Sequence, residues 1–285
     1  MKILVTGAGG FIGYHVIHNL LQRKHEVMAT DISREAASHK DWFQQVIFAE
    51  HTINDNAIAD NLFEKFNRPD KMIHLAWKGL PNYKESFHME ENLPHQFGFL
   101  KNLVENGLKD LLVAGTCFEY GMQSGCLKED MPAAPNNPYA LAKDTLRQSL
   151  EELRKKHGFL LKWPRLFYLY GNGQNPKSLL SQLEKALQAN EKVFNMSKGD
   201  QQRDYLPVET MADYIVRIAL QNKVTGVINC CSGKPVTVLS LVKDYLKQSG
   251  KTIQLNLGYY PYPDYEPMEF WGDTKKLAEA LSATA

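Results

Sequence analysis

The sequence predicts an α/β protein built on a doubly wound parallel sheet. Short apolar stretches rich in β-branched residues alternate with longer segments whose apolar residues recur at helical spacing, which is typical of βαβ units. After residue 170 of the 285 this alternation loosens. We therefore expect one domain with the sheet over residues 1–170 and a smaller C-terminal α+β lobe over residues 171–285, with segments that cross between them.

The residues of each segment justify the expected elements. The first strand is the apolar run from Ile3 to Val5, and the first helix has apolar residues at helical spacing from Val16 to Leu21. Proline and polar residues mark 128–137 as a loop. The same reasoning predicts further strands at residues 25–31, 45–49, 72–76, 108–115, 160–169 and 227–231, and further helices around 97–104, 139–157, 179–188, 211–221 and 238–248.

Three glycines lie between the first strand and the first helix. Gly7 permits a tight turn, Gly10 lets a pyrophosphate approach bare backbone, and Gly13 lets the helix pack close to the strand. The amides at the helix N-terminus would face the phosphates. This pattern predicts that residues 1–170 form a dinucleotide-binding Rossmann domain. The alternative is a glycine turn in an unrelated α/β protein, which the strand before and the acidic residue after the motif disfavour.

Asp31 is that acidic residue, at the end of the second expected strand. A carboxylate there accepts hydrogen bonds from a ribose 2′-hydroxyl and repels a 2′-phosphate, which favours NAD. Arg34 keeps NADP possible, because its guanidinium is near enough in sequence to receive that phosphate. The residues expected to bind the cofactor in this part of the chain are Gly7, Gly10, Phe11, Ile12, Gly13, Asp31 and Ile32.

A second pattern is the pair Tyr139 and Lys143, four residues apart on an expected helix. Positions i and i+4 share a helix face, so both side chains point into one site. A nearby ammonium favours the phenolate, so we expect Lys143 to lower the pKa of Tyr139 and tune it for proton exchange with a carbonyl or hydroxyl. Thr116 ends the fifth expected strand, at the edge where such sheets bind ligands. A surface tyrosine–lysine pair is the alternative.

The composition disfavours several kinds of partner and site. The net charge is +1 and 44% of the residues are hydrophobic, as in an ordinary soluble protein. We expect no nucleic-acid partner, no membrane partner and a cytoplasmic location, because there is no basic excess, spanning segment or signal segment. The 9 histidines lack the spacing of metal ligands, so no metal is expected, and the 4 cysteines read as buried residues without a redox role.

Several motifs carry a family resemblance. TGAGGFIG at 6–13, HLAW at 74–77, TCFEYG at 116–121 and YALAK at 139–143 resemble the extended short-chain dehydrogenases/reductases. Among these the chain is similar to the nucleotide-sugar epimerases, dehydratases and reductases. PRLFYLYG, QQRDYLPV and FWGDTKKL match later family blocks, so the resemblance covers nearly the whole chain. These ordered matches are specific for the family and much less specific for the reaction.

The resemblance implies a catalytic triad. Tyr139 would exchange a proton with the substrate, Lys143 would tune the phenol and bind the cofactor ribose, and Thr116 would complete the triad. The remaining residues implied to border the cofactor are Leu75, Ala76 and Trp77.

The resemblance also implies a substrate site, toward which the lobe over 171–285 would contribute. Arg203 would face the diphosphate of a nucleotide sugar, unless it forms an ion pair with Asp204 or lies in a solvated loop. Asn92 matches an asparagine at the start of the long helix beneath the site. The residues implied to contact the substrate are Cys117, Phe118, Tyr168, Arg203 and Tyr205.

Departures from the family patterns narrow the reaction. The family's 4,6-dehydratases carry an Asp–Glu pair after the triad threonine, whereas this chain has Cys117 and Phe118, so dehydration is not expected. Tyr168 stands where an asparagine is common, and residues 261–267 lack the arginine of many epimerases. Both differences weaken the inferred diphosphate site.

These inferences combine into one functional hypothesis. We expect an NAD(P)-dependent reductase or dehydrogenase that transfers hydride to or from C4 of a nucleotide-linked 4-keto-6-deoxyhexose, in deoxysugar and surface-polysaccharide synthesis. The alternatives are a nucleotide-sugar 4-epimerase and a non-catalytic dinucleotide-binding regulator. The resemblance also implies a homodimer joined through the helices around 92–106 and 139–157, although their apolar faces fit an intramolecular core equally well.

Overall fold

The computed structural model describes residues 1–54 and 60–283. Its main feature is an eight-stranded sheet in the order β12-β8-β5-β4-β1-β2-β3, with β6 also paired to β8. Every pairing in this sheet is parallel. The order runs outward from β1 in both directions, so the predicted doubly wound parallel fold is confirmed.

The strands are β1 (Lys2–Thr6), β2 (Glu26–Asp31), β3 (Ile47–Glu50), β4 (Lys71–His74), β5 (Asp110–Val113), β6 (Gly115–Thr116), β7 (Gly125–Leu127), β8 (Leu160–Leu166), β9 (Tyr168–Tyr170), β10 (Val193–Met196), β11 (Gln202–Pro207), β12 (Gly226–Cys230), β13 (Pro235–Thr237), β14 (Gln254–Leu257) and β15 (Phe270–Gly272). The helices are α1 (Phe11–Gln22), α2 (Arg34–Ser38), α3 (Leu62–Lys65), α4 (Leu93–Glu105), α5 (Pro138–His157), α6 (Leu179–Gln188), α7 (Val208–Leu220), α8 (Val238–Ser249) and α9 (Lys275–Ser282). Short helical turns are η1 (Phe43–Gln45), η3 (His88–Asn92) and η4 (Cys117–Tyr120).

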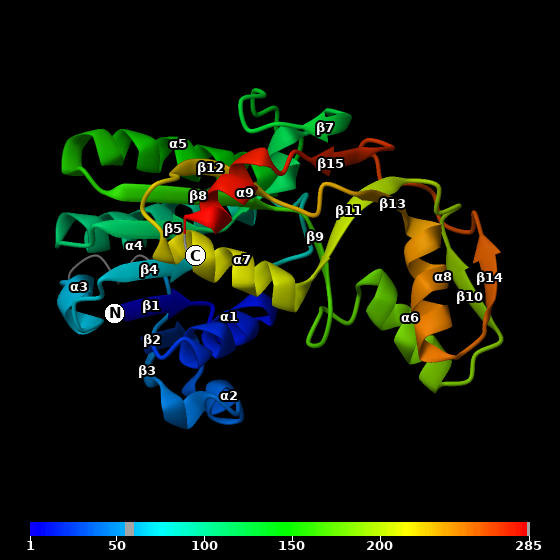
Figure 1. The fold of residues 1–285 in the computed structure, drawn as a ribbon, viewed down its shortest axis with the longest axis horizontal. Coiled ribbons are helices and arrows are strands. Elements are labelled where there is room, and N and C mark those ends of the chain that lie inside the picture. The colour runs from blue at the N-terminus through cyan, green and yellow to red at the C-terminus, as the bar shows by residue number, and fades with distance from the viewer. Residues whose placement is uncertain (55–59, 284–285) are drawn as a thin grey trace.

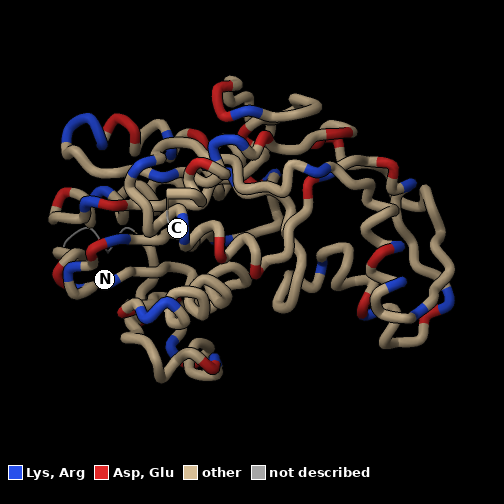
Figure 2. Tube along the Cα trace, in the orientation of Figure 1, with Lys and Arg blue, Asp and Glu red and all other residues tan. Residues whose placement is uncertain are grey.

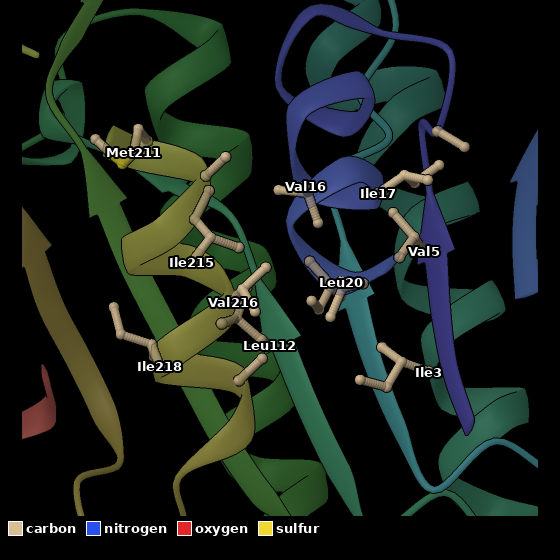
Figure 3. Close-up of a cluster of buried hydrophobic side chains, with 14 of the residues drawn as sticks. Ile3, Val5, Val16, Ile17, Leu20, Leu112, Met211, Ile215, Val216 and Ile218 are labelled. Atoms are coloured by element: carbon tan, nitrogen blue, oxygen red, sulfur yellow. The ribbon is translucent and has the colours of Figure 1, made fainter. Parts of the chain in front are cut away.

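Both faces of the sheet are covered by helices. Successive residues of a strand point to opposite faces, so Ile3 and Val5 of β1 pack with α1 and α7, while Leu4 packs with α4 and α5. Figure 3 shows the first of these clusters, with α1 and α7 side by side over the strands. All three side chains are fully buried. The burial of each contributes about 1.5–3 kcal/mol to the free energy of folding. The middle of the strand, Ile3 to Val5, is apolar on both faces because neither face meets water there.

The chain returns to the sheet after residue 170. The strand expected at 227–231 is β12, which pairs with β8 at the edge of the main sheet. Helix α7 packs against α1, and α9 packs against α7 and β12. The segments beyond residue 170 therefore include part of the sheet and its covering helices, and the division into two lobes at that residue stays a prediction.

The remaining C-terminal elements form a smaller body on the right of Figure 1. Helices α6 and α8 pack with the parallel pair β10 and β14 around their own apolar cluster. The strands β9, β11 and β13 pair with one another between this body and the main sheet. The smaller body thus lies beyond the carboxyl ends of the main strands, where parallel sheets bind ligands.

Charged residues of both signs are interspersed along the chain, as Figure 2 shows. In the described ranges, none of the helices combines the length and the apolar character that crossing a bilayer requires.

Candidate functional site

The loop between β1 and α1 is a close-packed turn. Gly7 has a φ of +65°, and a Cβ there would lie 3.0 Å from the amide nitrogen of Ala76. A Cβ on Gly13 would lie 2.1 Å from the carbonyl oxygen of Gly7. Gly10 is the N-cap residue of α1, so the first amides of the helix lie without a side-chain cap beside the loop. This cradle fits a pyrophosphate, since its glycines leave backbone amides open to an anion.

Asp31 lies against the same loop. Its carboxylate accepts hydrogen bonds from the amides of Gly9 at 2.8 Å and Ile32 at 2.8 Å. The carboxylate is therefore fixed at the end of β2, in the position expected for binding a ribose hydroxyl.

Arg34 is turned toward β3 instead. Its guanidinium donates to the carbonyl oxygen of Phe48 at 2.6 Å and lies 5.2 Å from the centre of that ring. Because the guanidinium is already engaged there, the local structure favours NAD over NADP.

Thr6 joins the glycine loop to the next strand of the sheet. Its hydroxyl accepts from the amides of Leu75 at 3.2 Å and Ala76 at 3.3 Å, and forms a hydrogen bond with Nδ1 of His74 at 2.9 Å. Burial lowers the pKa of His74 to about 3, so the imidazole stays neutral. The contacts of Thr6 and His74 were not predicted, although both residues lie within the motifs TGAGGFIG and HLAW.

Tyr139 is brought to the carboxyl edge of the sheet by the first turn of α5. Asn137 precedes the helix, and its side chain accepts from the amide of Ala140 at 2.9 Å, so the helix start is fixed. Thr116 ends β6, and both Thr116 and Tyr139 are about 7% exposed. Burial, followed by the neighbouring Tyr83, raises the pKa of Tyr139, and a hydrogen bond with Thr116 opposes the rise.

Lys143 lies one turn further along α5 and is 3% exposed. Its Nζ donates to the carbonyl oxygen of Ala114 at 2.9 Å and lies 4.0 Å from the centre of the Trp77 ring. Burial lowers the pKa of Lys143 to about 7. The expectation that this ammonium lowers the pKa of Tyr139 is wrong for this structure, because the phenol is dehydrated and the ammonium is directed to a carbonyl and an indole.

Aromatic rings surround the phenol of Tyr139. The Phe118 ring lies 5.0 Å from that of Tyr83, 6.1 Å from those of Tyr168 and Tyr265, and 6.5 Å from that of Tyr139, measured between centres. We call these five rings the aromatic box. Buried Cys117 packs in the same cluster, and burial raises the pKa of its thiol. Tyr83 and Tyr265 were not predicted as site residues, because they come from loops without a repeating pattern.

Arg203 lies beside the aromatic box and is 2% exposed. Its Nε and Nη2 donate to the Glu266 carboxylate at 3.0 and 2.9 Å, and Nη1 donates to the carbonyl oxygens of Gln202 and Met268. Both alternatives for Arg203 are therefore wrong, because it is neither solvated nor paired with Asp204. The Asp204 carboxylate instead accepts bonds from the backbone and hydroxyl of Ser232 and from other amides.

The other predicted site residues are also placed. The Tyr168 and Tyr205 rings lie 5.5 Å apart, beside Arg203. Asn92 directly precedes α4, as expected, but its side chain makes no capping bond and instead donates to the carbonyl oxygen of Lys78 at 2.9 Å. The structure thus brings Thr116, Cys117, Phe118, Tyr139, Lys143 and Tyr168 to one place, with Arg203 and Tyr205 at its border. Over residues 1–54 and 60–283, no group of three or more His, Cys, Asp or Glu side chains has the geometry to hold a metal ion.

Comparison with known protein families shows which family has this combination of fold and site. The model of the NAD dependent epimerase/dehydratase family matches residues 3–231. The chain belongs to this family. It is therefore an NAD-dependent enzyme, which confirms the predicted family, enzyme class and cofactor.

The enzyme is similar to curated proteins over nearly its whole length. The dTDP-6-deoxy-L-talose 4-dehydrogenase (NAD(+)) of Aggregatibacter actinomycetemcomitans is 28% identical over 277 residues, which cover 95% of the enzyme and 99% of that relative. The GDP-6-deoxy-D-talose 4-dehydrogenase of the same bacterium is 26% identical over 286 residues, covering 99% and 91%.

Among solved structures, the enzyme resembles the UDP-glucuronic acid 4-epimerase of Bacillus cereus in complex with UDP-glucuronic acid and NAD. The TM-score is 0.83 at 24% identity, over 99% of the enzyme and 93% of that chain. A likeness at this identity shows the shared fold.

Proposed function

We propose that the enzyme transfers a hydride between NAD and C4 of a nucleotide-linked 6-deoxyhexose, reducing its 4-keto form or running in reverse. The observation that carries this proposal is a buried Tyr139 phenol beside Thr116, followed by Cys117 and Phe118 rather than by carboxylates. Such a site can move one proton but has no acid and base pair for eliminating water. The similarity to two 6-deoxytalose 4-dehydrogenases supports the same reaction.

The chain's own groups would handle the proton. NAD, when bound, supplies or accepts the hydride. Because its pKa is raised, the Tyr139 phenol is protonated at neutral pH and can donate to a C4 oxygen as negative charge develops there. Thr116 would bond the same oxygen, and Lys143 would bond the cofactor ribose. The rings of the aromatic box would offer an apolar surface to a sugar whose C6 is a methyl group.

A nucleotide-sugar 4-epimerase is the second candidate, because one proton-transfer site serves both reactions. The two differ in what happens to the cofactor. Purified protein that retains stoichiometric NAD and consumes no added NADH in the presence of substrate would favour the epimerase. Net oxidation of NADH by a 4-keto sugar would favour the reductase.

A Tyr139→Phe variant tests the proton-transfer role. We expect kcat for NADH oxidation, measured with dTDP-, UDP- and GDP-linked 4-keto-6-deoxyhexoses, to fall by about 10²–10⁴-fold. NAD affinity and thermal stability should stay close to those of the parent. Tyr245→Phe on α8, remote from the box, is the matched control and should leave kcat unchanged. A Tyr139→Phe variant as fast as the parent would exclude this chemistry.

A further inference from the structure

We propose that Glu266 competes with the substrate for Arg203, occupying the guanidinium in the free enzyme and releasing it when the diphosphate of a nucleotide sugar binds. This inference rests on the proposed function. It assigns to Glu266 a role in setting substrate affinity.

The geometry of the pair supports competition. Glu266 accepts from Nε and Nη2 of Arg203, which form the edge of a guanidinium that a phosphate engages with two parallel bonds. The side chains of Arg203 and Glu266 are 2% and 11% exposed. A carboxylate in this position takes the same donors that a phosphate would use, so the two ligands exclude each other.

The charge of the pair points the same way. With Glu266 in place, the buried Arg203 is neutralised and offers little attraction to a diphosphate. Lys143 is directed to Ala114 and Trp77, and Lys84 pairs with Asp264 at 2.7 Å. A bound diphosphate would also lie close to the Glu266 carboxylate, and this repulsion ends only when Glu266 moves away.

The segment that carries Glu266 is suited to such a movement. We call residues 260–267, between β14 and β15, the strap. Backbone bonds hold the chain on either side, from Tyr259 to Met196 at 3.0 Å and from Gln202 to Met268 at 2.9 Å. The strap itself is tied by the Lys84–Asp264 pair, whose side chains are 59% and 77% exposed. The Tyr262 hydroxyl also donates to Asp200, and Asn136 Nδ2 donates to the carbonyl oxygen of Tyr265 at 3.2 Å. These contacts are all exposed to water and each contributes little to stability, so the strap can shift without unfolding its neighbours.

The strap also reaches the reacting end of the site. The Tyr265 ring, next in sequence to Glu266, lies 5.9 Å from that of Tyr83 and 6.1 Å from that of Phe118 in the aromatic box. Releasing Glu266 would therefore shift a ring that borders the space next to Tyr139. Diphosphate binding and the shape of the sugar site are coupled through two adjacent residues.

Glu266→Gln tests the competition. We expect this variant to bind UDP and dTDP on the order of tenfold more tightly than the parent in titration calorimetry, because the carboxylate's charge is gone. Asp264→Asn removes a charge from the same strap without touching Arg203, and should change affinity less than about twofold. Glu266→Asp, which shortens the side chain and keeps the charge, should give a smaller gain in the same direction and serves if Glu266→Gln folds poorly.

A double variant tests whether the gain passes through Arg203. Arg203→Met with Glu266→Gln removes both charges together, so neither is left buried without its partner. We expect it to bind UDP and dTDP on the order of tenfold more weakly than the parent. Equal affinity in the double variant and Glu266→Gln would overturn the assignment of Arg203.

The remaining outcomes separate this inference from the proposed function. If the parent turns over nucleotide sugars but Glu266→Gln and Glu266→Asp bind UDP and dTDP no more tightly, Glu266 is only a structural partner of Arg203 and the inference alone fails. If neither the parent nor any variant binds a nucleoside diphosphate or turns over a nucleotide sugar, the proposed substrate class fails as well.

Discussion

Lys143 carries an amino group in a place that water scarcely reaches. Its ordinary pKa of 10.5 falls to about 7 because burial penalises the charged form. The carbonyl oxygen of Ala114 and the face of Trp77 compensate the remaining charge only in part. This side chain therefore couples folding to protons in the cofactor-free protein.

The titration of Lys143 should make the free energy of unfolding rise with pH. Between pH 7 and 10.5 the unfolded chain keeps this proton while the folded chain has released it, so the free energy of unfolding increases with pH. From pH 6.5 to 9.5 the parent should gain on the order of 3 kcal/mol relative to Lys143→Met. Urea unfolding of both proteins without NAD measures this difference, and parallel pH profiles would contradict it.

Among single residues, those whose role follows from local spacing in the sequence were predictable. Those that reach the site only through contacts between distant parts of the chain were not. The glycines of the first loop and the pair Tyr139 and Lys143 were found because their spacing alone fixes a turn and a helix face. Glu266 was not found, since its partner Arg203 lies 63 residues away and no local pattern joins them. The direction of the Tyr139 pKa was missed for a similar reason, because burial depends on distant rings.

At the scale of elements, η4 organises the end of the sheet below Tyr139. Glu119 closes this turn by accepting from the amide of Thr116 at 2.9 Å. The same carboxylate accepts from Trp163 Nε1 at 2.9 Å and from Arg165 Nε at 2.7 Å on β8. Glu119 is 0% exposed and Arg165 2% exposed, so one buried carboxylate holds Thr116 and the neighbouring strand together.

Glu119→Gln should be costly because it leaves the Arg165 guanidinium buried without its counter-charge. We expect the free energy of unfolding to fall by about 3 kcal/mol. Glu152→Gln is the control, because Glu152 pairs with Lys155 on the exposed face of α5, and it should change stability by less than about 0.5 kcal/mol. Denaturant unfolding compares them, and equal losses would show that the buried pair has no special role.

The long helices and the strands of the main sheet were largely predictable, because a buried face gives the sequence a regular apolar spacing. The short strands β7, β10, β13, β14 and β15 were not predicted. The helix expected at 179–188 is α6 (Leu179–Gln188), and that expected at 139–157 begins one residue earlier at Pro138. The place of β12 in the main sheet was not predictable. The apolar run from Val227 to Cys231 fits any buried strand, and nothing local specifies β8 as its neighbour.

At the scale of the whole molecule, the expected homodimer can be tested at α4 and α5, the helices through which the two chains would join. These helices pack against each other, yet α5 leaves Leu141 44% exposed. Light scattering at micromolar concentration should give twice the mass of one chain, and Leu141→Glu should shift the mass toward one chain. Leu257→Glu, at an equally exposed leucine of β14, should leave the dimer intact. A monomeric parent would contradict the dimer.

The route of the chain between the two bodies limits how they can move. The chain leaves the main sheet after β8 and passes through β9, returns through β11 to β12, leaves again through β13, and comes back along the strap to β15. Because β9, β13 and β15 all lie beside β11, we expect the two bodies to rotate about the line of these connections more easily than they twist across it. In the proposed function, such a rotation would change the distance from the sugar to the Tyr139 oxygen.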